Sequence, residues 1–374
     1  MRAPAALPDG VVSLADHKAH ARQRLDAHAW AYLDSVAGDG LTRRANRLAW
    51  DALRLQPRLL RPRPAPSTQV QVLGRRLAHP LLLAPLAYQQ LFHPDGELAS
   101  ALAASAQEAG FVLSTLSSVS LETVAAAVRD DSGRGPLWFQ LYFQPDRGAT
   151  LELVRRAEAA GYEALVVTAD APVSGVRDGE RRARFRLPPG VTAANLSRVP
   201  RGGQTVAEAL AVAPDWTDVE WLAQSTRLPV LLKGVLHPAD ARQALAAGVR
   251  GLVVSNHGGR TLDGAVATAD ALPRIADATD GAVPLLVDGG VRRGTDVLKA
   301  IACGASAVLL GRPLAWGLAS AGATGVAHVL RVMRDELESA MALCGVAALR
   351  GMPGDLVVRA PAHVPFAHPD LFCK

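Results

Sequence analysis

The sequence predicts an α/β fold in which eight parallel strands close into a barrel. Eight short segments rich in Val and Leu recur along the chain, amphipathic segments separate them, and none of the eight alternates cleanly between apolar and polar residues. Parallel strands buried on both faces have this composition. Eight such strands alternating with helices favour a closed (β/α)8 TIM barrel over an open sheet.

The expected strands follow one another in chain order. They are residues 81–85, 111–115, 137–142, 164–170, 229–234, 251–257, 284–290 and 307–313. Helices are expected between them, as at 238–248 with Pro238 near its start and at 294–304 with Asp296 in its first turn. No glycine-rich dinucleotide motif follows the first strand, which counts against a Rossmann fold.

Two segments lie outside this repeat. Residues 1–75 form an N-terminal extension with a helical stretch at 14–39 and a Pro/Arg-rich connector at 56–66. The link at 171–228 between the fourth and fifth strands is far longer than the others, and two interpretations stay open: an active-site loop or a disordered insertion. We treat residues 1–374 as one domain.

Composition excludes several protein classes. The 374 residues are 49% hydrophobic and 20% charged, as in globular proteins with a large core. The net charge of +5 comes from scattered basic residues, so no nucleic-acid partner is expected. Neither a signal peptide nor a membrane span is predicted. Three widely spaced cysteines (Cys303, Cys344 and Cys373) favour a reduced, cytoplasmic protein, and we assign no metal site.

Polar residues and glycines gather where the expected strands end, which is where barrel enzymes carry their catalytic groups. They are Gln140, Tyr142, Thr168, Asp170, Lys233, His257, Arg260, Asp288, Gly289, Gly290, Arg292, Gly311 and Arg312. Polar strand ends can serve solubility alone, but their recurrence at one end indicates an active site. DGGVRRG (288–294) alone is equally consistent with a tight turn; together with GRP (311–313) it favours phosphate binding.

Several stretches resemble the FMN-dependent α-hydroxy-acid oxidases and dehydrogenases. They are SNHGGRTLDG (255–264), DGGVRRGTDVLKAIACGA (288–305), LLKGV (231–235), APLAYQQLFHPDGE (84–97) and FQLYFQPDR (139–147). The resemblance covers about residues 14–345, and within the family the stretches look most like bacterial 4-hydroxymandelate oxidases.

The resemblance implies FMN as cofactor and assigns residues to it. The flavin ring would be lined by Pro85, Leu86, Ala87, Ser114, Gln140 and Thr168, with Lys233 beside the N1–C2 carbonyl and Ser255 nearby. The phosphate would be held by Asp288, Gly289, Gly290, Arg292, Gly311 and Arg312. A fixed ammonium such as that of Lys233 stabilises the negative charge of a reduced flavin.

The resemblance also assigns the substrate side. It implies His257 as the base, Asp170 as its hydrogen-bond partner, Tyr142 as a contact to the substrate hydroxyl, and Tyr32 and Arg260 as ligands of the carboxylate. The chemistry agrees, because hydride loss from a hydroxyl-bearing carbon requires a base for the hydroxyl proton. The other histidines singled out, His17, His20, His28, His79 and His237, are expected to be surface or turn residues.

Two features depart from the family pattern. Val176 stands where the family normally has an arginine, and Arg177 follows; either Arg177 replaces it, or Arg260 and Tyr32 bind the carboxylate without it. Leu116 stands where many relatives carry a bulky aromatic residue, and Tyr88 stands where relatives often carry methionine. The smaller Leu116 and the aromatic Tyr88 favour a larger, mandelate-like or branched 2-hydroxy acid.

The function predicted is FMN-dependent oxidation of an L-2-hydroxy acid to the 2-oxo acid. Oxygen is the default acceptor, giving hydrogen peroxide, and the family resemblance implies a homotetramer. Two alternatives stay open within this fold, a non-standard biosynthetic substrate and an acceptor other than O2. A non-catalytic FMN-binding barrel would not need the set Tyr142, Asp170, Lys233, His257 and Arg260.

Overall fold

Eight parallel strands close into a barrel in the computed structural model, which describes residues 6–61, 65–197 and 205–360. The strands are β4 (Leu81–Leu83), β5 (Gly110–Ser114), β6 (Leu137–Leu141), β7 (Leu165–Thr168), β8 (Val230–Val235), β9 (Gly251–Val254), β10 (Leu285–Val287) and β11 (Ala307–Leu310). Neighbours pair in chain order, and β11 pairs with β4 to close the ring. Each strand lies at a predicted position, so the TIM-barrel prediction is confirmed.

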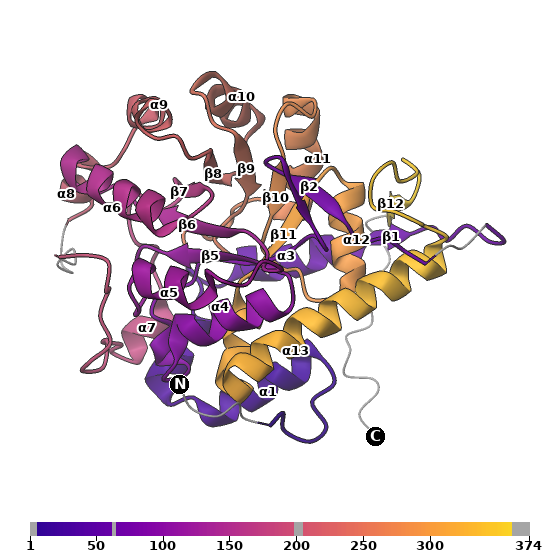
Figure 1. Cartoon of the computed structure of the whole chain (residues 1–374), viewed down its shortest axis with the longest axis horizontal. Coiled ribbons are helices and arrows are strands. Elements are labelled where there is room, and N and C mark those ends of the chain that lie inside the picture. Colours follow the sequence, from indigo (N-terminus) through magenta and orange to yellow (C-terminus); the bar gives the residue numbers. More distant parts are fainter. Residues whose placement is uncertain (1–5, 62–64, 198–204, 361–374) are drawn as a thin grey trace.

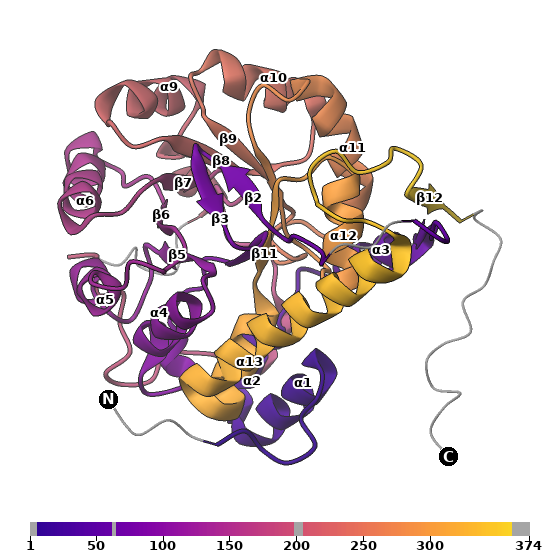
Figure 2. The same ribbon diagram turned by 45° about the vertical axis from the view of Figure 1, so that its right-hand side comes forward.

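Helices surround the strands (Figure 1; Figure 2). They are α4 (Gly96–Ala106), α5 (Leu121–Val128), α6 (Arg147–Ala160), α9 (Trp216–Ser225), α10 (Pro238–Ala246), α11 (Thr268–Thr279), α12 (Gly294–Ala302) and α13 (Arg312–Cys344), with a 3₁₀ turn η1 (Gln89–Leu91) before α4. The helices α10 and α12 confirm the two that were predicted from sequence. Within α13 the dihedral angles of Ala321 and Gly322 are not helical, and the helix changes direction there.

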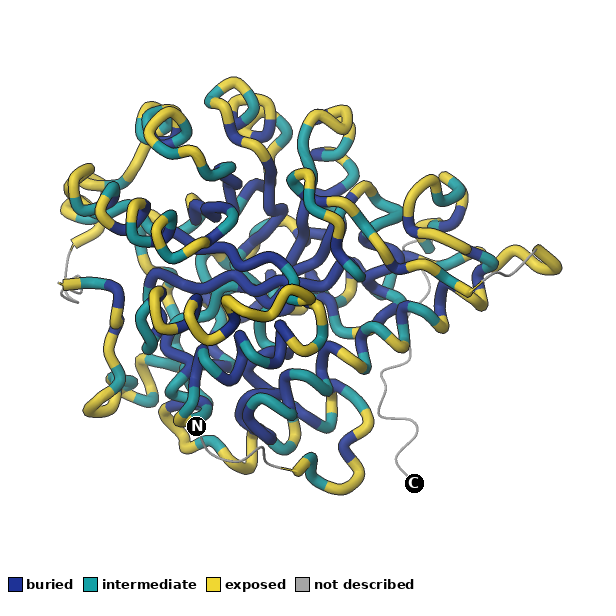
Figure 3. Tube along the Cα trace, viewed as in Figure 1, coloured by how far each residue is buried: buried dark blue, intermediate teal, exposed yellow. Residues whose placement is uncertain are grey.

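The strands form the buried centre of the molecule (Figure 3). A smaller apolar cluster, which includes Leu82, Val166 and Leu231, fills the barrel interior. A larger one, which includes Leu113 and Leu272, lies between the strands and the surrounding helices. The hairpin of β2 (Val70–Val72) and β3 (Arg75–Leu77) contributes Val72 and Leu77 to the interior cluster. Arg75 also pairs with Glu163, just before β7, so the hairpin closes the N-terminal end of the barrel. The C-terminal end of the barrel is therefore the end at which a functional site can form.

The N-terminal extension consists of α1 (Leu14–Arg24), α2 (Ala27–Asp34), α3 (Leu41–Ala52) and β1 (Leu53–Leu55), which pairs with β12 (Val357–Arg359). The predicted helical stretch at 14–39 is two helices, because the Asp26 side chain accepts a hydrogen bond from the Ala29 N–H and starts α2. Helix α1 lies along α13 (Figure 2).

His17 contradicts the prediction of a surface or turn residue, and His79 lies in a bend but is buried. His17 is fully buried between α1 and α13, where its ring nitrogens lie 3.0 Å from Ser320 Oγ and 2.9 Å from His328 Nδ1. His79 lies in the bend before β4 but is also buried, with Nε2 2.7 Å from the Gln107 carbonyl oxygen. Both rings find polar partners inside the protein, which the sequence does not reveal.

The long link at 171–228 contains α7 (Asp178–Arg182), α8 (Val206–Ala211) and α9 within its described residues. Residues 198–204 lie outside the description, as do 62–64 of the 56–66 connector and Cys373. Cys303 and Cys344 are free thiols. None of the described helices combines the length and hydrophobicity that a membrane crossing requires.

Candidate active site

A cavity of about 1420 Å³ opens at the C-terminal ends of the barrel strands. Its wall contains nearly all the predicted site residues: Tyr32, Pro85, Leu86, Ala87, Ser114, Gln140, Tyr142, Thr168, Asp170, Arg177, Lys233, His257, Arg260, Asp288, Gly289, Gly290, Arg292, Gly311 and Arg312. Ser255 is the exception, because it is buried behind this wall. The fold therefore brings residues from all along the chain into one site.

His257 and Asp170 form a hydrogen-bonded pair in this wall. Asp170 follows β7, His257 follows β9, and His257 Nδ1 lies 3.1 Å from Asp170 Oδ1. His257 has a left-handed backbone (φ 56°), and its N–H donates to Ser255 Oγ at 3.1 Å. Burial acts to raise the pKa of Asp170, but the charge of Lys233 and the hydrogen bond with His257 outweigh it, so the pKa lies below its ordinary value. An ionised carboxylate beside an imidazole orients a general base.

Lys233 lies in β8 with its ammonium group buried among acidic partners. Its Nζ donates to Ser255 Oγ at 2.8 Å and lies 3.3 Å from Asp288 Oδ2. Ser255 Oγ in turn donates to Asp288 Oδ1 at 2.7 Å. Burial acts to lower the pKa of Lys233, yet the charges of Asp288 and Asp170 raise it above its ordinary value. The cavity wall therefore carries a permanent positive charge here.

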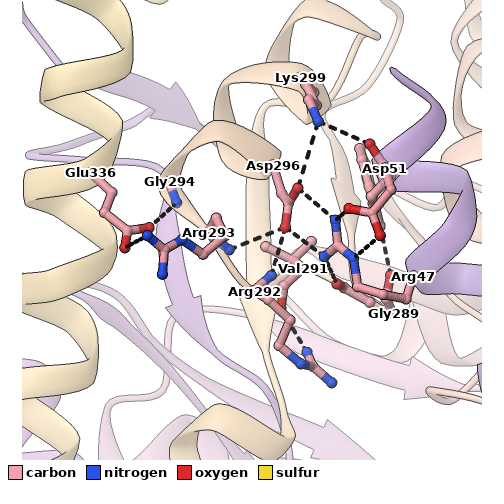
Figure 4. Close-up of polar contacts among 12 residues, drawn as sticks. Arg47, Asp51, Gly289, Val291, Arg292, Arg293, Gly294, Asp296, Lys299 and Glu336 are labelled. Atoms are coloured by element: carbon pink, nitrogen blue, oxygen red, sulfur yellow. Dashed lines mark hydrogen bonds and ion pairs between the residues drawn. The ribbon is translucent and has the colours of Figure 1, made fainter. Parts of the chain in front are cut away.

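Arg292 and Arg312 line the cavity after β10 and β11 without a carboxylate partner among the described residues. Arg312 donates to three backbone carbonyls at 2.8–3.2 Å. The guanidinium of Arg292 points away from Asp296 in Figure 4 and lies 4.9 Å from the Trp316 ring centre. Burial lowers the pKa of Arg292 to about 10 and, with the charges of nearby arginines, lowers that of Arg312 well below its ordinary value. This surplus of positive charge is suited to an anion.

Helix α3 supports the neighbouring loop at 288–294 (Figure 4). Arg47 donates to the Gly290 carbonyl and pairs with Asp296 through two guanidinium nitrogens, at 2.7 and 2.9 Å. Trp50 Nε1 donates to the Gly289 carbonyl at 2.8 Å. Gly289 and Gly290 both have positive φ (88° and 86°). The hydrogen bonds from α3 therefore fix the carbonyl groups of this loop.

The predicted carboxylate ligands Arg260 and Tyr32 lie together. Arg260 Nη1 donates to the backbone carbonyls of Tyr32 at 2.8 Å and Ser35 at 3.2 Å, and its guanidinium carbon lies 5.1 Å from the Tyr32 ring centre. Burial raises the pKa of the Tyr32 phenol. Burial, with the charge of Asp170, also raises that of Tyr142. Both phenols therefore remain hydrogen-bond donors at neutral pH.

Arg177 reaches the same part of the cavity. Val176, by contrast, has a side chain 51% exposed, and its carbonyl accepts a hydrogen bond from the Gly38 N–H at 2.9 Å. Glu180 was not predicted from the sequence; its Oε2 lies 3.3 Å from Arg177 Nε and its Oε1 lies 3.3 Å from Arg260 Nη2. In the sequence, Glu180 stands in a charged run that resembles a solvated helix; only its spacing of three residues from Arg177 hints at a pair.

Aromatic rings form another part of the wall. Phe185, also missed in the sequence, stacks on Tyr32 with ring centres 4.9 Å apart, and Tyr88 meets Tyr32 edge-on at 6.4 Å. The Tyr88 N–H donates to the Leu116 carbonyl at 3.0 Å, and both side chains line the cavity. Phe185 could not be found from strand-end reasoning, because it comes from the long link.

Comparison with known proteins identifies the family. The family described as FMN-dependent dehydrogenase matches residues 21–359. The chain belongs to this family. An L-lactate oxidase from Alicycliphilus denitrificans is 48% identical, over 93% of this chain and 97% of that protein. A 4-hydroxymandelate oxidase from Amycolatopsis orientalis is 47% identical, over 89% and 94%.

Solved structures agree with this membership. A mandelate oxidase with (S)-2-phenylpropionate superposes with a TM-score of 0.83 at 46% identity, covering 90% of this chain and 96% of that one. A mandelate oxidase with benzoyl-formic acid gives the same values. The chain is thus an FMN-dependent oxidoreductase of the 2-hydroxy-acid oxidase type, as the motifs predicted.

The cavity wall fits the family's cofactor. Gln140 Oε1 accepts hydrogen bonds from Ser114 Oγ at 3.1 Å and the Thr115 N–H at 3.2 Å, which fixes the amide. Its Nε2 is buried and has no partner among the described residues, so a donor is left for a ligand. Together with the positive charges of Arg292 and Arg312, which have no carboxylate partner among the described residues, this amide suits a polar ring and a phosphate.

Proposed function

We propose that this enzyme oxidises L-2-hydroxy acids with a bulky, mandelate-like side chain to the corresponding 2-oxo acids. The observation that carries the proposal is one cavity wall in which the His257–Asp170 pair shares space with Arg177 and Arg260. A base for the hydroxyl proton and two cations for the carboxylate are what a 2-hydroxy acid requires.

His257 is the proposed base. Because its Nδ1 faces Asp170, Nε2 is the nitrogen left to take the hydroxyl proton. The ionised Asp170 holds the ring in this orientation and stabilises the imidazolium that results. Tyr142, a donor in the same wall, contacts the substrate hydroxyl.

The cofactor residues act electrostatically. When bound, FMN supplies the acceptor for the hydride that leaves the substrate carbon. Lys233, held by Ser255 and Asp288, provides a fixed positive charge that favours the reduced cofactor. Arg292 and Arg312, with the glycine loops, hold the phosphate.

The substrate carboxylate is bound by Arg260, Arg177 and Tyr32. Of the two possibilities left open for the strand-four loop, the position of Arg177 in the cavity wall favours the one in which it replaces the family arginine. Leu116 leaves room beside Tyr88 for an aromatic or long aliphatic side chain. The names of two relatives, 4-hydroxymandelate oxidase and mandelate oxidase, support this size preference.

Oxygen is the proposed electron acceptor, giving hydrogen peroxide, and the protein is proposed to be a cytoplasmic homotetramer with one domain over residues 1–374. The names of the oxidase relatives support the acceptor. The family resemblance supports the tetramer, and the three widely spaced cysteines support the compartment.

An anaerobic spectral titration of the purified holoenzyme tests the proposal. L-mandelate, L-2-hydroxyisocaproate, L-lactate, glycolate and the D-enantiomers of the chiral acids are added in turn. Bleaching of the flavin band by the L-series alone, with higher kcat/KM for L-mandelate than for glycolate, supports it. Readmitted air should restore the band and release hydrogen peroxide. A flavin that no 2-hydroxy acid bleaches overturns the proposal.

A further inference from the structure

Glu180 joins the two arginines that face the substrate carboxylate. Its Oε1 accepts a hydrogen bond from Arg260 Nη2 at 3.3 Å, and its Oε2 lies 3.3 Å from Arg177 Nε. All three side chains are at most one-quarter exposed. Both distances exceed the 2.7–2.9 Å typical of strong charge-assisted bonds. The carboxylate therefore bridges the arginines loosely.

A short helix fixes this glutamate over the cavity. Glu180 lies in α7, and its backbone carbonyl accepts a hydrogen bond from the Phe185 N–H at 2.9 Å. Phe185 stacks on Tyr32, so the turn after α7 is packed against the substrate side of the site. Glu180 belongs to the cavity wall and is not a solvated surface residue.

The charges around the carboxylate site can be counted. Lys233 keeps its charge, but Asp288 offsets it within their ion pair. Asp170 is ionised beside His257, so that pair supplies no positive charge for the substrate carboxylate while His257 is the free base. The remaining charges are those of Arg177, Arg260 and Glu180, which sum to one positive charge.

We propose that Glu180 restricts the site to 2-hydroxy acids with a single carboxylate. One substrate carboxylate balances the positive charge left by Arg177, Arg260 and Glu180, whereas a second carboxylate in the same cavity finds no further free arginine charge there and is repelled by Glu180. Like charges that share a cavity without a compensating cation disfavour binding. This inference deepens the proposed function and rests on it; Glu180 is a specificity residue and takes no part in proton transfer.

The Glu180→Gln variant tests this proposal. Binding to the holoenzyme is measured from the flavin spectrum with oxalate as a dianion and propionate as a monoanion, and kcat/KM is measured for L-malate and L-lactate. We expect the preference for dianion over monoanion to rise on the order of tenfold or more in both ratios. Asp178→Asn, on the same helix but exposed, is the matched control and should leave both ratios unchanged.

Glu180→Asp retains the charge and should keep the wild-type ratios. The proposal is overturned if Glu180→Gln, with wild-type FMN content and melting temperature, shows unchanged ratios. It is also overturned if Asp178→Asn shifts them equally, because net charge alone would then explain the effect. Failure of the proposed function is distinguishable, since no 2-hydroxy acid would bleach the wild-type flavin while oxalate and propionate would still report on Glu180.

Discussion

Gly234 lies directly against Asp170. Gly234 has a φ of 111°, and a β-carbon built on it would lie 2.4 Å from the β-carbon of Asp170. A contact this short is impossible between real side chains, so the backbone of β8 approaches β7 closely only because residue 234 is glycine. The orientation of the Asp170 carboxylate therefore depends on a neighbouring strand.

Gly234→Ala should displace Asp170 and destabilise the fold. Both the positive φ and the clash act against the variant, so we expect a loss of at least about 2 kcal/mol in the free energy of unfolding, together with lower activity. Chemical denaturation and the rate of flavin reduction measure the two effects. Gly179→Ala, where a β-carbon meets nothing within 4 Å, is the control. Equal stability of the two variants would contradict the argument.

Asp170→Asn should reduce turnover without loss of FMN. The neutral amide no longer stabilises a protonated His257, so we expect kcat to fall by about 100-fold or more. Stopped-flow reduction under anaerobic conditions measures this step, and the flavin absorbance of the purified variant gives its FMN content. Because the pKa of Asp170 lies below its ordinary value, the wild-type carboxylate stays ionised at neutral pH. A variant within threefold of wild type would remove Asp170 from the mechanism.

Arg312→Met should weaken FMN binding. Loss of one charge-assisted contact to the phosphate costs about 1.5–3 kcal/mol, or roughly tenfold to 150-fold in Kd. Titration of apoprotein with FMN, followed by fluorescence quenching, gives the Kd. Arg293→Met is the matched control, because Arg293 is 57% exposed and pairs with Glu336. If both variants bound FMN equally well, Arg312 would not be a phosphate ligand.

Arg177→Met tests whether this residue replaces the family arginine. We expect kcat/KM to fall about tenfold or more, chiefly through KM, because a charged contact to the substrate carboxylate is lost. Arg182→Met, in the same segment but 79% exposed and outside the cavity wall, should behave as wild type. An unaltered KM would mean that Arg260 and Tyr32 bind the carboxylate without help.

The buried His17 predicts a dependence of stability on pH. Burial, assisted by the charge of His328, lowers the pKa of His17 from 6.5 to about 4. The unfolded chain then binds more protons than the folded one between these values, so stability is fully present above about pH 6.5 and is lost as the pH falls toward 4, by on the order of 2 kcal/mol. Denaturation curves at several pH values measure this slope. His17→Gln should flatten it; an unchanged slope would assign the effect to other groups.

The barrel and most of its site were predictable from sequence because both follow from local pattern. Strands buried on both faces carry apolar runs. In a closed parallel barrel the residues at the C-terminal ends of the strands lie at one end of the barrel, independently of the path of the loops. This reasoning located His257, Asp170 and Lys233, which come from three different strands.

Residues outside the strand ends escaped prediction. Glu180 and Phe185 belong to the long link, whose path over the cavity depends on tertiary packing. His17 was expected at the surface or in a turn, because a short polar helix with one further histidine gives no sign that α13 covers His17. Ser255 was expected to contact FMN but lies behind the wall between Lys233 and Asp288.

The support that α3 gives to the loop at 288–294 has a consequence for any shortened form of this enzyme. The amides of Asn46 and Asn256 exchange two hydrogen bonds at 2.8 Å, so α3 is tied to the loop carrying His257 as well as to the loop of the proposed phosphate site. A protein shortened to its eight βα units would lack α3. The loop at 288–294 and the loop carrying His257 would then lose the hydrogen bonds that α3 gives them. We therefore expect folding of the extension to be coupled to binding of the cofactor: FMN should protect α3 from proteolysis, although α3 contributes no predicted FMN ligand.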